Sequence, residues 1–335
     1  MIRISVVGMG MAFEPHARAL SERTDRVQVR WATSRSSDRL DAARRLGFPV
    51  TSDVAAAIAD PEVDAVFLLT PPDTHHSLGS LAISRGKHLL VEKPLDARLD
   101  QARDLVRMAD EADVRLGVVL QHRFRRSSIR FAELLRARSL GAIQFATVSV
   151  PWWRTQAYYD QPGRGDLARD GGGVLMTQAL HTLDVFRAAL GPVEVIAARA
   201  ATTALHTMET EDLVCALLSL PGGAPATLMA TTAFPPGCTE RIEVVGELGA
   251  AVLQGEALQV RWIDGREERC GEALETGSGV AAMGFSHVPH GALIDDFCKA
   301  IVERRPPVAS GDEALATQEF IDRLLQTAGA VHRLK

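Results

Sequence analysis

The chain has 335 residues, which is more than one hydrophobic core usually holds, since single cores stop growing near about 250–300 residues. Hydrophobic residues make up 46% and charged residues 24%, a globular composition that excludes general disorder. The net charge of −5 argues against a basic nucleic-acid-binding face. No apolar run reaches the about 18–20 residues of a membrane helix. We therefore expect two globular domains and neither a nucleic-acid nor a membrane partner.

The N-terminus and the cysteines predict a cytoplasmic protein. Met1 leads directly into an apolar, strand-like segment, and no basic region, long apolar stretch or cleavage site precedes it, so no signal peptide is predicted. The four cysteines are widely and irregularly spaced, with no Cys-x-x-Cys pair and no clustered histidines. This pattern predicts reduced thiols, no metal site and no disulfide framework.

Strand and helix patterns alternate through the first third of the chain. Apolar strands are predicted at 2–8, 27–33, 64–70, 87–92 and 114–120, with a short segment at 48–53, and helices at 14–23, 37–47, 75–85 and 99–113. Nearly continuous apolar strands separated by helices are typical of a parallel sheet covered on both faces. Right-handed crossovers then predict a doubly wound, Rossmann-type α/β domain over residues 1–122.

The pattern changes after residue 122. One helix is predicted at 127–138, strands at 144–152, 193–201, 213–220, 226–232, 241–245 and 259–262, and two closing helices at 291–304 and from 312 onward. Strands that follow one another through short turns are typical of antiparallel pairing. Residues 123–335 are therefore predicted to form an α+β domain with a large, open, mostly antiparallel sheet. Its last helices could pack back on the first domain.

The glycine-rich turn after the first strand, GMGMAFEPH, predicts a phosphate site. Gly8 allows the tight turn, and Gly10 lets the backbone approach a pyrophosphate at the helix N-terminus, with Met11 and Ala12 beside it. Phe13 stands where glycine or alanine would let helix and strand pack closely, so it predicts a slightly displaced helix. An ordinary turn is the alternative, but the position between the first strand and the first helix favours a dinucleotide.

The end of the second strand bears on the choice of cofactor. An acidic residue there would hydrogen-bond the ribose hydroxyls of NAD. This chain has Ser34 and Arg35 instead, and an arginine can stack on adenine and pair with a 2′-phosphate. A solvated turn is the alternative. We therefore expect NADP to be preferred over NAD.

Three further motifs carry a resemblance to a known family: TPPDTHH at 70–76, LVEKPLD at 90–96 and GGGVLMTQALHTLD at 171–184. With the glycine-rich turn, they resemble the GFO/IDH/MocA family, named for glucose-fructose oxidoreductase, inositol dehydrogenase and rhizopine catabolism. The resemblance covers almost the whole chain. It implies an NAD(P)-dependent oxidoreductase that transfers a hydride between nicotinamide and a secondary alcohol or ketone of a sugar, sugar acid or cyclic diol. The implied cofactor contacts include Thr70, Pro71, His75, Glu92, Lys93 and Pro94.

The same resemblance implies the catalytic residues. Lys93 matches the family lysine that polarises the reacting oxygen, and Pro94 matches a proline whose peptide bond is commonly cis. His181 matches the family's general acid or base, and its ordinary pKa suits that role. Asp184 lies one helical turn further on and could orient the imidazole. The alternatives are a core histidine and a surface pair between Lys93 and Glu92, and the resemblance disfavours both.

The substrate residues depart in part from the family pattern. Thr177 stands where the family often has an acidic residue, and Gln178 follows it. A threonine can hydrogen-bond a hydroxyl but does not exchange protons at neutral pH. Lys93 and His181 therefore remain as the expected pair, and all four residues are expected to contact the substrate.

An aromatic and arginine-rich segment at 151–173 precedes the His181 helix. Tyr158 could form a flat wall of a substrate pocket, and Arg154 and Arg164 could bind a carboxylate. Arg123, after the sixth strand of the first domain, could also face the cleft. Packing at a domain or oligomer interface, where such residues are also enriched, is the alternative.

Two other functions stay open from the sequence. One is a non-catalytic sensor that binds cofactor and sugar on the same fold, and the other is a dehydrogenase of a cyclic dihydrodiol carboxylate. Aldehyde oxidation through a thiolate lacks support, because no cysteine lies near the glycine-rich turn or His181. An open antiparallel sheet must cover its outer face, so a homodimer or homotetramer through this sheet is expected.

Overall fold

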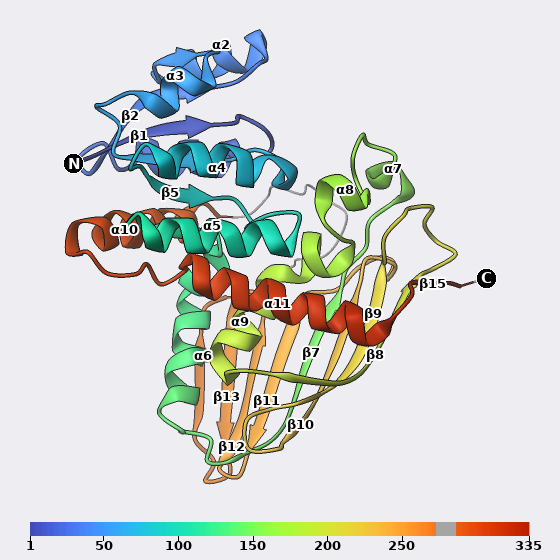
Figure 1. Ribbon diagram of the computed structural model, residues 1–335. Helices are drawn as coiled ribbons and strands as arrows, with labels where there is room; N and C mark the ends of the chain where they lie inside the picture. The colour runs from blue at the N-terminus through green and yellow to red at the C-terminus, as the bar shows by residue number, and fades with distance from the viewer. Residues whose placement is uncertain (273–285, 335) are drawn as a thin grey trace. The chain divides into compact units, whose positions relative to one another are not determined.

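The computed structural model describes residues 1–272 and 286–334 (Figure 1). Its described residues form two compact units. The first contains residues 1–121 and 286–315, and the second contains residues 122–272 and 316–334.

The first unit is built on a six-stranded parallel sheet in the order β3-β2-β1-β4-β5-β6. Its strands are β1 (Ile2–Val7), β2 (Val27–Thr33), β3 (Val50–Thr51), β4 (Ala65–Leu68), β5 (His88–Val91) and β6 (Leu116–Val118). The crossover helices are α1 (Phe13–Ser21), α2 (Ser37–Arg45), α3 (Val54–Ala59), α4 (His75–Ser84) and α5 (Leu99–Glu111), with a 3-10 turn η1 (Pro72–Thr74) before α4. The predicted doubly wound fold is confirmed, and the wholly buried β4 shows why its sequence is continuously apolar.

A helix from the C-terminal part of the chain, α10 (Val288–Glu303), belongs to this first unit and contacts α1. Its Phe297 packs edge-to-face on Phe67, with ring centroids 5.9 Å apart. Gly117 leaves room for this ring, since a Cβ atom there would stand 2.9 Å from Phe297. The apolar face of α10 therefore completes the covering of the parallel sheet.

The second unit is built on a nine-stranded sheet in the order β14-β13-β12-β11-β7-β10-β9-β8-β15. Its strands are β7 (Ile143–Pro151), β8 (Glu194–Thr202), β9 (Leu213–Ser219), β10 (Pro225–Thr231), β11 (Arg241–Gly246), β12 (Gly249–Gln254), β13 (Ala257–Trp262), β14 (Glu267–Cys270) and β15 (His332–Arg333). Pairs β7–β10 and β8–β15 are parallel and the others are antiparallel. The predicted large, mostly antiparallel sheet is confirmed.

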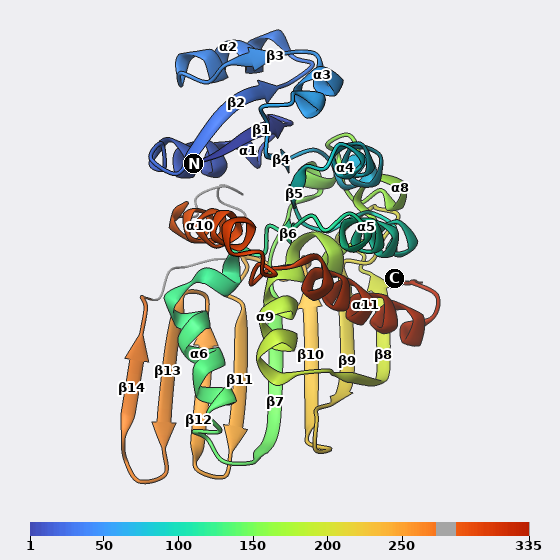
Figure 2. The ribbon, with the colours of Figure 1, turned by 60° about the vertical axis from the view of Figure 1, so that its left-hand side comes forward.

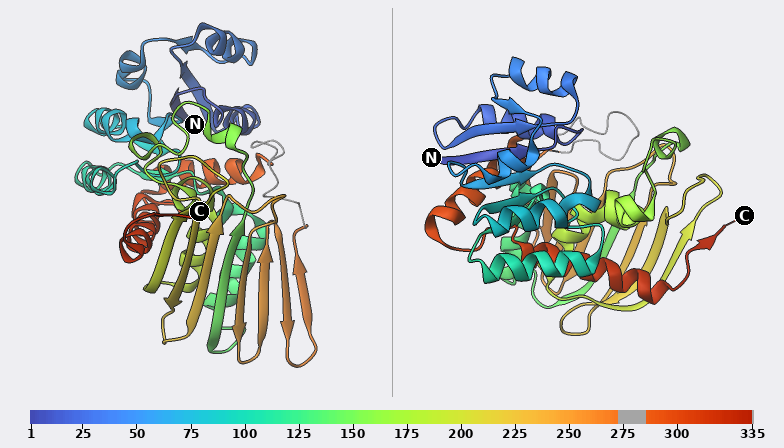
Figure 3. Two further views of the ribbon diagram at one scale, coloured as in Figure 1. Left: turned by 90° about the vertical axis from the view of Figure 1, so that its right-hand side faces the viewer. Right: turned by 45° about the horizontal axis from the view of Figure 1, so that its top comes forward.

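Helices cover one face of this sheet, as Figures 2 and 3 show for α6 (Arg126–Arg136) and α9 (Leu180–Leu190). Short elements lead into them: η2 (Gln121–Phe124), α7 (Gln156–Tyr159), α8 (Leu167–Asp170) and the π-helical turn η3 (Leu175–Ala179). The last helix, α11 (Gly311–Ala328), has its residues from 316 onward in this unit. Along the strands, buried side chains alternate with exposed ones such as Phe145 and Leu217.

Within the described ranges, the helices are all too short or too polar to span a bilayer.

Candidate active site

The glycine-rich turn between β1 and α1 has the shape that a pyrophosphate requires. Gly8 has φ of 97°, and a Cβ atom there would stand 2.7 Å from the carbonyl oxygen of Leu69. Gly10 faces open space, since a Cβ atom would meet nothing within 4 Å. The N-cap of α1, Ala12, makes no side-chain hydrogen bond, so the first N–H groups of α1 are not satisfied by its side chain. These features fit a dinucleotide phosphate.

The side chain of Phe13 packs against other hydrophobic residues of the first unit. Its ring lies edge-to-face against Phe48, with centroids 6.2 Å apart, and it borders a small buried cluster that includes Met9 and Ala32. Met11 at the turn is exposed. A large side chain at position 13 therefore has a hydrophobic partner.

The residues after β2 leave a cation at the surface. Ser34 is buried, and its hydroxyl accepts a hydrogen bond from the N–H of Ser36 at 3.1 Å. Arg35 is exposed, and within residues 1–272 and 286–334 no carboxylate forms an ion pair with it. Its guanidinium is therefore available to a phosphate.

His75 ties together the loops that follow β4 and β5. Its ring is fully buried, with Nδ1 3.1 Å from the carbonyl oxygen of Pro94 and Nε2 2.9 Å from that of Thr70. Both ring nitrogens thus face backbone carbonyls. His75 holds the two loops together, which corrects the expectation that it contacts the cofactor directly.

Lys93 lies on the loop after β5, and its peptide bond to Pro94 is cis. The backbone N–H of Lys93 donates to Glu92 Oε2 at 3.1 Å, and Glu92 Oε1 is 2.9 Å from Nε2 of the buried His16. Burial alone would raise the pKa of Glu92, but the hydrogen bond and charge of His16 outweigh it and lower that pKa. An ionised Glu92 therefore braces the Lys93 backbone.

His16, Glu92 and His290 lie close enough to be considered as metal ligands. One ligand atom of each lies within 4.8 Å of the other two, and no other set in the described part of the chain meets this condition. In a tetrahedral zinc site, ligand atoms about 2.1 Å from the metal stand about 3.4 Å apart. The His16–Glu92 contact of 2.9 Å is shorter, so the arrangement is that of a hydrogen-bonded cluster.

In the second unit, the glycine run at 171–173 leads into the helix of His181. A Cβ atom on Gly173 would stand 1.9 Å from the carbonyl oxygen of Glu211. The Glu211 carboxylate accepts hydrogen bonds from the N–H of Gly173 at 3.0 Å and of Leu175 at 3.3 Å. Burial raises the pKa of Glu211 to about 7. Glu211 thus fixes the start of η3, a π-helical turn of the kind that is frequent at functional sites.

His181 is buried near the start of α9 and stacks on another histidine. Its ring centroid is 4.5 Å from that of His122, with an interplanar angle of 28°. Two charged imidazoles at this distance would repel each other. An imidazole in its neutral form can accept a proton from a hydroxyl.

Asp184 and Arg123 are partners of each other. Arg123 donates from Nε and Nη2 to the two Asp184 oxygens, at 2.6 Å each, and Thr317 Oγ1 donates to Asp184 Oδ1 at 2.8 Å. This corrects the expectation that Asp184 orients His181, because its oxygens are taken by Arg123 and Thr317. The physical reason is that a buried guanidinium is strongly destabilising without a carboxylate. The expected contact of Arg123 with a substrate stays a prediction.

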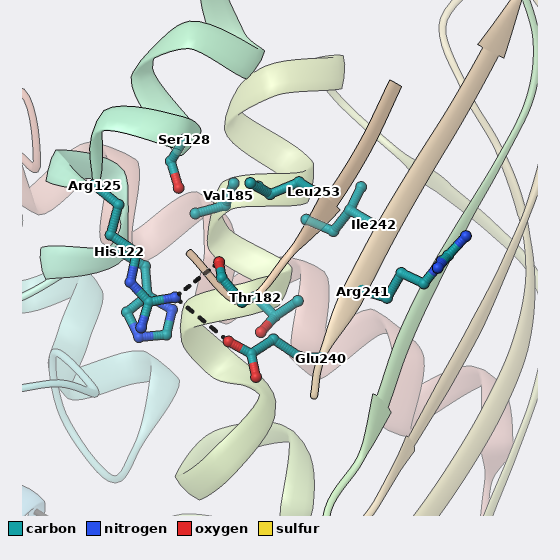
Figure 4. A pocket seen from close by; sticks show the side chains of 10 residues that line it. His122, Arg125, Ser128, Thr182, Val185, Glu240, Arg241, Ile242 and Leu253 are labelled. Carbon is teal, nitrogen blue, oxygen red and sulfur yellow. Dashed lines mark hydrogen bonds and ion pairs between the residues drawn. The ribbon is translucent and has the colours of Figure 1, made fainter. Parts of the chain in front are cut away.

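A small pocket lies beside the histidine stack (Figure 4). It is lined by His122, Arg125, Ser128, Thr182, Val185, Glu240, Arg241, Ile242, Leu253 and Gly255. Arg125 Nη1 is 3.4 Å from Glu240 Oε1 and 3.3 Å from the carbonyl oxygen of Gly255, and its Nε is 3.4 Å from Glu256. Two carboxylates thus pair with Arg125, and one of them, Glu240, lines the pocket.

Two of the arginines that were expected to bind substrate lie against the ring of Tyr158. The Cζ atoms of Arg154 and Arg164 lie 5.7 and 4.9 Å from its ring centroid. Its hydroxyl accepts a hydrogen bond from Gln178 Nε2 at 3.2 Å. Thr177 donates its hydroxyl to the carbonyl oxygen of Gly173 at 2.7 Å. Five of the expected substrate residues therefore lie in one connected cluster.

Sequence reasoning missed Glu211, His206 and Asp212. His206 Nδ1 is 2.7 Å from Asp212 Oδ2, and its Nε2 is 2.7 Å from the carbonyl oxygen of Arg154. These residues lie in a connection between β8 and β9 that has no recognisable motif. The acidic pair at 211–212, directly before an apolar strand, was the one available signal.

Comparisons with known proteins agree with this fold. A model described as "Oxidoreductase family, NAD-binding Rossmann fold" matches residues 2–120, and the "GFO/IDH/MocA C-terminal domain" matches residues 129–252. The fold and these matches define an NAD-binding oxidoreductase. The chain belongs to the GFO/IDH/MocA family, as its motifs predicted.

Individual relatives are dehydrogenases. Inositol 2-dehydrogenase of Rhizobium meliloti (strain 1021) is 25% identical over 332 residues, which cover 91% of this chain and 98% of that protein. The 1-carboxy-3-chloro-3,4-dihydroxycyclo hexa-1,5-diene dehydrogenase of Comamonas testosteroni is 32% identical over 192 residues, covering 56% and 47%. The structure of the WlbA dehydrogenase from Bordetella pertussis, in complex with NADH and UDP-GlcNAcA, has a TM-score of 0.82 at 28% identity, covering 98% and 96%. The chain is thus an NAD(P)-dependent dehydrogenase or reductase acting on an alcohol group.

Proposed function

We propose that this enzyme interconverts a secondary alcohol and a ketone on a sugar, a sugar acid or a cyclic diol. The observation that carries the proposal is the position of Lys93, on a loop braced by Glu92 and His16. This loop lies at the carboxyl end of a parallel strand, where doubly wound domains bind their ligands. The comparison with inositol 2-dehydrogenase and with the WlbA dehydrogenase supports a substrate of this kind.

The chain's own residues have distinct roles in this proposal. When bound, the nicotinamide supplies the hydride acceptor or donor. The Lys93 ammonium hydrogen-bonds the reacting oxygen and stabilises its developing negative charge. His181, which stacks on His122, takes the hydroxyl proton at a ring nitrogen and returns it in the reverse direction. Gly8 and Gly10 hold the pyrophosphate.

We also propose a preference for NADP, on the basis of Arg35. The exposed guanidinium after β2 can pair with a 2′-phosphate, and no acidic residue stands there to repel it. A fluorescence titration with NADPH and NADH tests this, with Arg35→Ala as the variant. We expect Arg35→Ala to weaken NADPH binding about tenfold or more and NADH binding little. Equal affinities of the wild type for both cofactors would remove the NADP preference and leave the dehydrogenase proposal intact.

Assembly through the outer face of the nine-stranded sheet is a further proposal. Phe145 and Leu217 are exposed on this face, at 44% and 45%. An open sheet with apolar side chains on its outer face is stabilised by burial against another copy. We therefore expect a homodimer or homotetramer in solution, which sedimentation equilibrium would detect.

Binding of the cofactor without turnover of any alcohol would favour a non-catalytic sensor over the proposed dehydrogenase.

A further inference from the structure

Arg154 is a half-buried arginine just after the end of β7. Its Nη1 donates to the carbonyl oxygen of Trp153 at 2.9 Å, while its enclosed Nε makes no hydrogen bond. Across the described ranges 1–272 and 286–334, no carboxylate forms an ion pair with it. Burial lowers the pKa of Arg154, and the positive charge of Arg164 lowers it further. The aromatic rings of Trp152 and Tyr158, at 5.2 and 5.7 Å from its Cζ atom, compensate part of this lost hydration, and an anion would compensate more of it.

The other enclosed arginines of the same unit show the contrast. Arg123 has both oxygens of Asp184 at 2.6 Å, and Arg125 has Glu240 at 3.4 Å. The fold therefore supplies a carboxylate to a buried arginine where the arginine is structural. Among the residues that the structure describes, none supplies a carboxylate to Arg154.

The backbone of Arg154 is nevertheless held firmly. Its N–H donates to the carbonyl oxygen of Thr232 at 2.9 Å, and its carbonyl oxygen accepts from Nε2 of His206 at 2.7 Å. His206 also bonds Asp212 at 2.7 Å. Burial alone would lower the pKa of His206, but these hydrogen bonds outweigh it and raise that pKa. A protonated ring that donates from both nitrogens fits this geometry, so the guanidinium is presented from a fixed base.

Two further contacts connect Arg154 to the helix of His181. Arg154 and Arg164 both lie against the ring of Tyr158, at 5.7 and 4.9 Å from its centroid. The Tyr158 hydroxyl accepts a hydrogen bond from Gln178. Gln178 precedes His181 by three residues, which is about one helical turn. The two positive charges are therefore tied to the element that carries the proposed acid–base residue.

We propose that Arg154 and Arg164 form a subsite for an anionic oxygen group of the substrate, a carboxylate or a phosphate, beside the wall made by Tyr158. The planar guanidinium fork binds such groups through two parallel hydrogen bonds. The proposal rests on the proposed function, because it places the charged end of the substrate near the His181 helix. It narrows the substrate to acidic sugars, sugar phosphates or carboxylated cyclic diols.

The test is a thermal-shift titration of the full chain saturated with NADPH or NADH, whichever binds more tightly. The probes are D-glucose, D-glucuronate and D-glucose 6-phosphate, each at about 50 mM so that weak binding still raises the melting temperature. The variants are Arg154→Gln and Arg154→Lys, with Arg136→Gln as the control. Arg136 is exposed in the last turn of α6 and loses the same charge.

We expect at least one acidic probe to raise the melting temperature of the wild type and of Arg136→Gln, while glucose has little effect. Arg154→Gln should bind that probe about 10- to 100-fold more weakly, with Arg154→Lys in between. Without a probe, Arg154→Gln should melt at or above the wild-type temperature, because an unpaired buried charge has been removed. A carboxylate source and a phosphate source are distinguished by which acidic probe gives the larger shift.

Three results would overturn the anion subsite. The first is an equal rise of the melting temperature with glucose and with both acids. The second is a response of Arg154→Gln to the acidic probe as large as that of the wild type. The third is a much lower melting temperature of Arg154→Gln without a probe, which would make the arginine structural. Turnover is measured separately on the same samples, by the change in nicotinamide absorbance. An Arg154-dependent shift without any turnover would count against the dehydrogenase proposal alone, and turnover of neutral polyols without an anion effect would count against the subsite alone.

Discussion

Glu211 offers the most direct physical test of how the helix of His181 is held. Its carboxylate is 2% exposed and accepts hydrogen bonds from the N–H groups of Gly173 and Leu175. These bonds favour the ionised form, and burial favours the neutral form. Burial prevails and raises the pKa to about 7. Replacing the group by an amide in Glu211→Gln removes its titration and keeps its shape.

The magnitude follows from the two pKa values. The ordinary value is 4.5 and the native value is about 7, a difference of about 2.5 units at 1.36 kcal/mol each. Between these values the native state binds more protons than the unfolded state, so the free energy of unfolding falls as pH rises. This stabilisation is complete below pH about 4.5 and lost above about 7. The full contribution is about 3 kcal/mol, and about 2 kcal/mol of it falls between pH about 5.5 and 8.

Urea denaturation at these two pH values measures the effect, with Glu194→Gln on the exposed start of β8 as the control. Between the lower and the higher pH, the free energy of unfolding of the wild type and of the control should fall by about 2 kcal/mol more than that of Glu211→Gln. Other titrating groups are shared by all three proteins and cancel in the difference. An equal pH dependence in Glu211→Gln and wild type would refute the assignment of a neutral, buried Glu211 at low pH.

Three further predictions concern packing and assembly. Gly173→Ala should lower the free energy of unfolding by at least about 2 kcal/mol, because the new Cβ atom would stand 1.9 Å from a backbone oxygen. The control Gly172→Ala should lower it less, because the new Cβ atom would meet only the side chain of a methionine. Asp184→Asn should cost about 3–5 kcal/mol in the same assay, because it leaves the Arg123 guanidinium without its carboxylate; a loss below about 1 kcal/mol would mean that the pair is solvated. Leu217→Arg should convert an oligomer to monomers in sedimentation equilibrium, and a monomeric wild type would remove the proposed interface.

Much of the fold could be predicted from sequence because its physical signals are local. The apolar strands of the first unit are buried on both faces, so β1, β4 and β5 read as continuous hydrophobic runs. The strand β12 was not predicted, since its sequence GAAVLQ has small residues and a weak alternation. The membership of α10 in the first unit depends on contacts between distant segments, such as Phe297 with Phe67, which no local pattern encodes.

In the site, too, local motifs could be predicted from the sequence and contacts between distant segments could not. The glycine-rich turn and the EKP motif were visible because each places several special residues within a few positions. The partners of Asp184 were misjudged because helical spacing shows that two side chains can meet and does not show which third residue reaches them first. Here Arg123, 61 positions away in the chain, occupies the carboxylate. The support of Arg154 by His206 and Asp212 was equally invisible, since it joins segments about fifty residues apart.

In the proposed reaction, Lys93 and His181 carry out alcohol oxidation with a nicotinamide cofactor. Nicotinamide absorbance measures this reaction in both directions. For oxidation, the enzyme is mixed with NAD or NADP and a panel of polyols, sugar acids and carboxylated diols. For reduction, it is mixed with NADH or NADPH and the corresponding ketones. We predict turnover by the wild type, and a loss of about 100-fold or more in Lys93→Met and in His181→Ala, with cofactor affinity nearly unchanged in His181→Ala. Wild-type rates in either variant would contradict the role of the replaced residue. No turnover by the wild type in either direction would contradict the proposed activity.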